Sequence, residues 1–162
     1  MSNSRTDMIA RSSDLDIAGE LCRAGGEFFG VQVARYSPAA LIARLNEQDV
    51  SLVAAVVDGS TIGFAGYAVN PMNRRQATVS VSARSDMHAR LILAAHLDLL
   101  STAARIGSFV SVLRADSSFV DIYRAAGFTE VGRLRARRYC DHLHHDEVVL
   151  HHSFGEKSGV RS

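Results

Sequence analysis

The sequence predicts an α/β (α+β) protein with a mixed, mostly antiparallel sheet of six to seven strands and helices on both faces. Two observations support this prediction. Three extended segments joined by tight turns follow two helical segments, so hairpins precede any crossover. A strand, a long amphipathic helix and another strand then follow one another, which is typical of a βαβ-like crossover between parallel strands.

The first 50 residues predict one strand and two helices. Residues 8–11 are extended, and Ser13-Asp14 can cap a helix that ends before Gly25-Gly26. Ser37-Pro38 marks the start of the second helix, because proline is favoured in the first helical turn.

The middle of the chain predicts a hairpin, a strand and a long helix. Asp58-Gly59 separates the apolar segments 51–57 and 61–69, which is a strong hairpin signal. Residues 77–83 alternate between apolar and polar side chains as in a strand. Residues 86–105 carry apolar side chains at helical spacing.

The last third predicts a buried strand at 109–113, a short helix at 118–126 and strands at 129–139 and 147–154. Gly127 is a natural C-terminal cap for the short helix. No linker or repeat interrupts this order, so we expect one domain over residues 1–155 and a disordered tail over 156–162.

Composition limits the classes of partner. Of the 162 residues, 47% are hydrophobic and 22% are charged, with a formal net charge of +1. This balance predicts a substantial core and argues against nucleic acid or an anionic membrane as a partner. The densest basic run is read as the solvated edge of a strand: Arg133, Arg135, Arg137 and Arg138.

The expected location is the cytoplasm. Cys22 and Cys140 lie far apart and form no metal or redox motif. The polar start of the chain leads into no signal-peptide-like apolar stretch, and no segment has the roughly 20 apolar residues of a membrane span.

The most specific motif lies in the short helix, where Tyr123 is followed by three residues and then by Gly127-Phe128. This pattern resembles the Tyr-x-x-x-Gly-Phe signature of the GNAT N-acetyltransferases, with Asp116 at a position that is Asn in the family. The resemblance implies that the helix, including Phe119, packs beside the pantetheine arm of coenzyme A, and that Tyr123 protonates the departing thiolate. The run that follows, through Tyr139 to Val148, is similar to the branch with polyamine and ribosomal-protein acetyltransferases.

The resemblance also implies a pyrophosphate loop at the start of the long helix. Arg84 and Ala89 match the ends of the family pattern Arg/Gln-x-x-Gly-x-Gly/Ala, but Met87 stands where the first glycine belongs. A methionine there crowds the phosphate and makes a positive φ costly, and Asp86, read as an N-cap, competes for the same amides. The loop residues expected to bind the cofactor are Arg84, Met87, His88, Ala89 and Arg90.

In the implied reaction an amine attacks the thioester of acetyl-CoA. Backbone N–H groups of Val79, Ser80 and Val81 would polarise the thioester oxygen. No carboxylate stands on this strand to deprotonate the amine. The candidate bases are therefore His145, Asp146 and Glu147, near the end of the chain.

The histidine-rich last hairpin raises the alternative of a metal centre. Neighbouring side chains of a strand point to opposite faces, so three or four ligands would not converge. We expect exposed histidines and no metal at this group: His142, His144, His145, His151 and His152.

The resemblance predicts an acetyl-CoA-dependent N-acetyltransferase acting on the primary amine of a small molecule, such as an amino sugar, a polyamine or an amino acid derivative. It leaves a homodimer open. Met87 and the missing carboxylate motivate the alternative, a catalytically silent GNAT-like module that binds a ligand or a protein.

Overall fold

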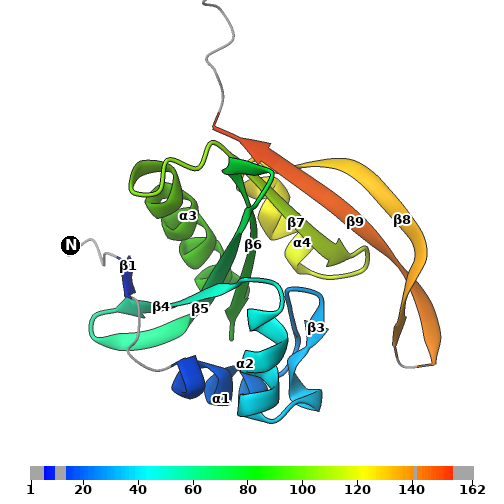
Figure 1. The fold of residues 1–162 in the computed structure, drawn as a ribbon, viewed down its shortest axis with the longest axis horizontal. Helices are drawn as coiled ribbons and strands as arrows, with labels where there is room; N and C mark the ends of the chain where they lie inside the picture. The colour runs from blue at the N-terminus through cyan, green and yellow to red at the C-terminus, as the bar shows by residue number, and fades with distance from the viewer. Residues whose placement is uncertain (1–5, 10–13, 141, 155–162) are drawn as a thin grey trace, which may run out of the picture.

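A seven-stranded sheet forms the centre of the computed structural model, which describes residues 6–9, 14–140 and 142–154 (Figure 1). The strand order is β1-β4-β5-β6-β7-β9-β8, and β6–β7 is the parallel pair. The other pairs are antiparallel. The strands are β1 (Thr6–Ile9), β4 (Ser51–Val57), β5 (Ser60–Asn70), β6 (Asn73–Ala83), β7 (Ser108–Arg114), β8 (Thr129–Cys140) and β9 (Leu143–Ser153). The predicted sheet is confirmed.

Helices cover both faces of this sheet, as the sequence predicts. The helices α3 (Asp86–Thr102) and α4 (Phe119–Ala125) pack on one face, in a core with apolar side chains of β6, β7 and β9. The helices α1 (Asp14–Ala24) and α2 (Pro38–Asn46) pack on the other face against β4 and β5 (Figure 1). Among the described residues, no helix is long and apolar enough to cross a membrane.

Local signals fix several element boundaries. The Ser37 hydroxyl accepts a hydrogen bond from the Ala40 N–H at 3.3 Å, so it caps α2 as predicted. Asp58 and Gly59 both have positive φ, which is the conformation of a tight hairpin turn. Gly127 ends α4 with a φ of 102°.

A small second hairpin is absent from the sequence-based prediction. Strands β2 (Glu27–Phe28) and β3 (Val31–Gln32) form a two-stranded sheet, followed by a 3₁₀ turn at η1 (Val33–Arg35). Phe29 lies at the turn with a φ of 51°, which is costly for a bulky side chain. Its N–H donates to the Ser80 hydroxyl of β6 at 3.3 Å, so the turn is tied to the central sheet.

The basic run on β8 is not wholly a solvated edge, which corrects the prediction. Arg133, Arg135 and Arg137 are exposed, but only 13% of the Arg138 side chain is exposed. The β8–β9 register shifts between Leu134 and Arg138, and Ala136 has a φ of 48° there. This bulge interrupts the regular strand geometry just before Arg138, whose guanidinium reaches the interior.

Candidate active site

The sheet opens between its two central strands. The parallel β6–β7 ladder has three residue pairs and ends at Thr78 and Val110. Beyond this point β6 continues to Ala83 and β7 continues to Arg114, each paired only with its outer neighbour. The backbone groups of β6 that face β7 therefore lose their strand partner. The Ser111 hydroxyl takes over one of these contacts by donating to the Val79 carbonyl at 3.0 Å.

Tyr123 lies at this opening. Its side chain is completely buried, and its ring packs edge-on against Phe128 with 5.0 Å between ring centroids. Among the described residues, no group has the geometry of a hydrogen bond to its hydroxyl. Burial raises the pKa of Tyr123 to about 12, and the nearby Ser111 hydroxyl and Val81 backbone lower this pKa by less than burial raises it. The hydroxyl is therefore protonated at neutral pH.

A cavity of about 260 Å³ lies where the two strands separate. Ser82 and Ala83 line it from β6, Leu113 lines it from β7, and the start of α4 closes it at 117–119. The segment 24–27 lines the same cavity from the other face of the sheet. The cavity therefore connects the predicted cofactor side, at Phe119, with the side of α1 and β2.

The start of α3 differs in two ways from the sequence-based prediction. Ser85 is the N-cap, and its hydroxyl accepts from the His88 N–H at 3.1 Å, whereas Asp86 is the first helical residue. Met87 belongs to the first turn and has no positive φ, so backbone strain is not the obstacle that its position predicts. Its side chain is nevertheless 64% exposed beside the helix end.

The other predicted cofactor residues take several positions. Arg84 and Arg90 are exposed, and Arg84 lines a second cavity of about 770 Å³ that Arg23 also borders. Ala89 is buried in the core, on the side of α3 that packs against the sheet. The N–H groups of Asp86 and Met87 have no partner in the described part of the chain, so this helix end can receive an anion.

Comparisons with known proteins identify the fold. No family model and no curated protein matches the sequence. A solved chimera of the Vibrio cholerae spermidine N-acetyltransferase SpeG and hSSAT superposes with a TM-score of 0.76 at 15% identity, covering 93% of this chain and 96% of that one. A dodecameric structure of the Vibrio cholerae spermidine N-acetyltransferase gives 0.71 at 15% identity, with 94% and 95% covered. A protein provisionally assigned as a phosphinothricin N-acetyltransferase gives 0.73 at 15% identity, with 93% and 99% covered.

This chain has the GNAT acetyltransferase fold. These structures share its fold over nearly their full length, and in this chain that fold contains the splayed β6–β7 pair, the short helix with Tyr123 and the long helix α3.

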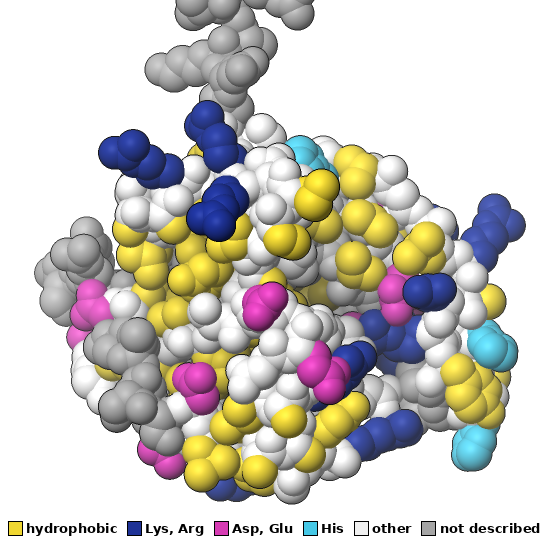
Figure 2. All heavy atoms as spheres, in the orientation of Figure 1, with side chains coloured by type: hydrophobic (Ala, Val, Ile, Leu, Met, Phe, Trp, Pro, Cys, Tyr) yellow, Lys and Arg dark blue, Asp and Glu magenta, His cyan; other side chains and the backbone are white. Residues whose placement is uncertain are grey.

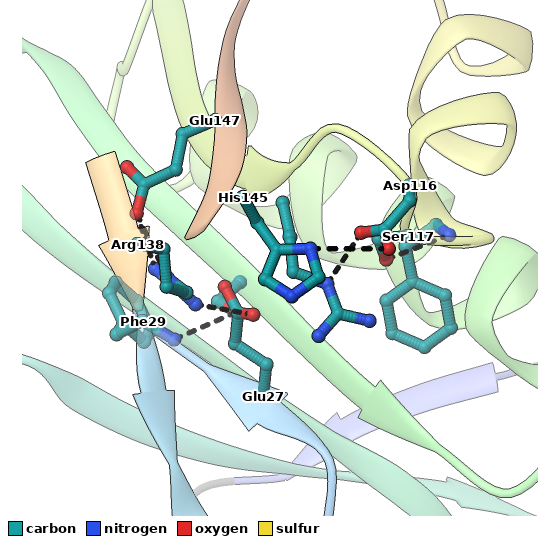
Figure 3. A network of polar contacts seen from close by, with 10 residues as sticks. Glu27, Phe29, Asp116, Ser117, Arg138, His145 and Glu147 are labelled. Atoms are coloured by element: carbon teal, nitrogen blue, oxygen red, sulfur yellow. Dashed lines mark hydrogen bonds and ion pairs between the residues drawn. The ribbon is translucent and has the colours of Figure 1, made fainter. Parts of the chain in front are cut away.

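The face of this GNAT-type sheet opposite α3 and α4 carries a network of charged side chains (Figure 3). Arg138 pairs with Glu27 of β2, and its Nη2 lies 2.8 Å from Glu147 Oε1 of β9. The side chain of Glu147 is only 11% exposed. The network joins segments that are distant in the sequence. Glu147, His145 and Asp116 are predicted site residues, whereas Glu27 and Arg138 were not predicted to belong to the site.

Asp116 belongs to the second half of this network. One of its oxygens lies 2.5 Å from Arg114 Nε, and the other lies 3.6 Å from His145 Nδ1. Its carboxylate thus contacts residues of β7 and β9 (Figure 3). A cavity of about 650 Å³ is lined by Glu27, Arg35, Arg114 and Asp116, among others.

The three candidate bases have different surroundings. Asp146 accepts from the Ala136 N–H at 2.9 Å and lies 3.6 Å from Arg133 Nη1, so it stabilises the β8 bulge. Glu147 is held by Arg138. The His145 Nε2 atom is buried and has no partner among the described residues.

The histidine-rich hairpin is less uniform than predicted. His142 and His144 are exposed, and the ring centroids of His144 and Tyr139 lie 5.0 Å apart. Figure 2 shows histidine beside hydrophobic side chains on the surface of the molecule. His152 instead packs against Phe109 and Phe128 and contacts the Gly127 carbonyl at 3.0 Å. Within the described ranges, no three His, Cys, Asp or Glu side chains come together as metal ligands.

Proposed function

We propose that this protein is an acetyl-CoA-dependent N-acetyltransferase that transfers an acetyl group to the primary amine of a small molecule by direct attack. The observation that supports the proposal most strongly is the opening between β6 and β7, with the protonated, unpartnered Tyr123 hydroxyl at its base. An unsatisfied buried hydroxyl is rare in proteins and is often a group kept for a ligand.

The residues around the opening suit a long cofactor with an anionic end. The cavity at Ser82, Leu113 and Phe119 can take the pantetheine arm, and the free amides of Asp86 and Met87 can receive the pyrophosphate. Arg84 and Arg90 add positive charge near that end. Bound acetyl-CoA supplies an activated acyl group and a thiolate leaving group.

The chain's own groups supply the remaining chemistry. The Val81 backbone lies near the Tyr123 hydroxyl at the unpaired part of β6, where an N–H can stabilise developing charge on the acetyl oxygen. Tyr123 donates a hydrogen bond to the departing sulfur. Its ring is fixed by Phe128, so the donor is oriented before the reaction begins.

Two residues favour the alternative of a catalytically silent binding module. The Asp86 carboxylate repels a pyrophosphate, and the exposed Met87 side chain lies at the same helix end. Cβ bonds of a helix tilt toward its N-terminus, so this side chain leans toward the proposed phosphate position.

An assay of thiol release tests the proposed activity. The purified chain is mixed with acetyl-CoA and each member of a panel of amines: a polyamine, an amino sugar and amino acid derivatives. We expect amine-dependent release of coenzyme A, with the acetylated amine identified by mass spectrometry. Binding of acetyl-CoA without acetylation of any amine would instead favour the silent module.

The broader setting of the enzyme follows the same proposal. We infer a small-molecule acceptor in the cytoplasm, where the free thiol of Cys22 would stay reduced. A homodimer or larger assembly is in keeping with the dodecameric spermidine N-acetyltransferase that shares the fold. Light scattering of the purified protein measures the assembly directly.

A further inference from the structure

Three buried polar atoms on the network side of the sheet lack a hydrogen-bond partner among the described residues. They are Nη1 of Arg138, which lies against the other Glu27 oxygen, and two acceptors, Oε1 of Glu27 and Nε2 of His145. Glu27 lines both the cavity at the β6–β7 opening and the larger cavity beside Asp116. In Figure 3 the imidazole of His145 lies between Glu27 and Asp116. Buried polar atoms in proteins are nearly always bonded to protein, water or a ligand, so the two acceptors mark a place where a bound group can complete the bonding.

The orientation of His145 determines what its free nitrogen can do. Nδ1 lies 3.6 Å from Asp116 Oδ2, so the carboxylate favours the tautomer with the proton on Nδ1. Nε2 then carries the lone pair and accepts hydrogen bonds. The Glu27 Oε1 atom is also an acceptor. Both Glu27 Oε1 and His145 Nε2 therefore need a hydrogen-bond donor.

The unpaired carboxylate oxygen of Glu27 favours a cation as the donor. Among the ion-paired side chains, Arg138 and Arg114 carry two positive charges, and Glu27, Glu147 and Asp116 carry three negative charges. Arg35 also lines the cavity beside Asp116 and balances this sum, so the local charge at the Glu27 oxygen, and not a net excess, is what attracts a cation. A primary ammonium group is both a cation and a multiple donor.

We propose that the acceptor's ammonium group binds between Glu27 Oε1 and His145 Nε2, and that His145, positioned by Asp116, is the base that deprotonates it. This inference rests on the proposed acetyltransfer. One N–H proton passes to Nε2, and the freed lone pair forms the C–N bond with the acetyl carbon. The second N–H proton passes to the coenzyme A thiolate as the C–S bond breaks, while Tyr123 stabilises the departing sulfur by donating a hydrogen bond. His145 releases its proton to solvent.

The fold separates the two proton-transfer groups. Val148 and Leu150 of β9 belong to the same core as Tyr123, so the alternating side chain of Glu147 lies on the other face. Arg114 alternates in the same way with the buried Leu113 of β7. The base therefore lies on the face of α1 and β2, while the acid lies on the face of α4. The amine approaches from one face, and the thiolate leaves toward the other.

His145→Gln tests the base, and His144→Gln is the matched control because His144 is exposed and contacts Tyr139 instead. We expect H145Q to lower kcat by about 10²–10⁴-fold, the usual contribution of a positioned base, with unchanged acetyl-CoA affinity. Added imidazole should partly restore the activity of His145→Ala. H144Q should behave as wild type.

Glu27→Gln tests the ammonium contact, since glutamine keeps the shape and removes the charge. We expect KM for the amine to rise by about tenfold or more, the equivalent of one lost charged contact, in protein that still melts cooperatively and still binds acetyl-CoA. The inference is wrong if wild-type protein acetylates an amine and H145Q does so at the same rate. It is also wrong if E27Q leaves KM unchanged. Absence of acetyl-CoA binding in the wild type would instead remove the proposed function itself.

Discussion

Burial gives the Tyr123 hydroxyl its chemical character. A pKa of about 12 keeps the proton on oxygen across the neutral range. A thiol has an ordinary pKa of about 8.5, so its thiolate is a weaker base than the Tyr123 phenolate. The hydroxyl therefore stabilises the leaving group mainly by donating a hydrogen bond as the C–S bond breaks.

Replacing Tyr123 by phenylalanine removes this donor and keeps the ring that packs on Phe128. We expect kcat to fall by about 10²–10⁴-fold, the range for a positioned acid, while the acetyl-CoA dissociation constant stays the same. Steady-state kinetics and calorimetry on the same preparation measure both quantities. Turnover at the wild-type rate would exclude Tyr123 from the mechanism.

Single residues also show where sequence-based prediction succeeds and fails. Tyr123 is found by its motif, because Gly127 and Phe128 stand at fixed spacing after it. Glu27 has no such signal, since it lies in a two-residue strand beside two glycines. His145 is one of three candidates in sequence, and only the contacts of Asp146 and Glu147 separate it from them.

At the scale of elements, the first turn of α3 determines how a phosphate can approach. Met87 is helical there, so its side chain, rather than its backbone, is the obstacle. We expect Met87→Gly to tighten coenzyme A binding in a calorimetric titration. Met87→Ala should have nearly the same effect, because alanine removes the thioether and favours the helix.

A difference between these two variants would contradict that explanation. If only Met87→Gly tightens coenzyme A binding, residue 87 must adopt a positive φ when coenzyme A is bound. No tightening by either variant would mean that the pyrophosphate binds elsewhere.

The packing of α3 on β5 predicts sensitivity to acid. His96 is completely buried on α3, and its Nε2 lies 3.2 Å from the Gly66 carbonyl. Burial lowers the pKa of His96 to about 4, and the Gly66 carbonyl opposes this shift only in part. The unfolded chain, with a histidine pKa of about 6.5, therefore binds the proton more readily. Stability is lost as the pH falls from about 6.5 toward about 4.

His96→Gln removes this titration and keeps an amide that can donate to Gly66. Between about pH 7 and pH 5, we expect the wild type to lose about 2 kcal/mol more of its unfolding free energy than the variant. Urea unfolding at the two pH values measures the difference. Parallel losses in both proteins would show that His96 is not responsible.

Elements differ in how far the sequence determines them. Hydrophobic periodicity predicts the sequence in which the strands of the large sheet and the four helices follow one another along the chain. Ser37 marks the start of α2, and Gly127 marks the end of α4. The β2–β3 hairpin could not be predicted, because two-residue strands show no alternation. The inward position of Arg138 depends on a bulge, and local sequence gives no measure of register shifts.

At the scale of the whole molecule, the fold places an acid and a candidate base on opposite faces of one opening in the sheet. Strands β6 and β7 separate after three pairs, and α4 holds Tyr123 beneath the gap. The charged network reaches the same region from β2, β7, β8 and β9. The acid and the candidate base are both positioned by contacts between segments that are distant in the sequence. No local motif specifies which distant segments pair.

Calorimetric titration of acetyl-CoA into the purified chain tests the central claim most directly, because cofactor binding separates an acetyltransferase from a silent module. We predict saturable binding with a dissociation constant of about 1 μM to 1 mM, the ordinary range of enzyme substrates, and competition by free coenzyme A. Absence of saturable heat over that range, in protein that melts cooperatively, would contradict the account.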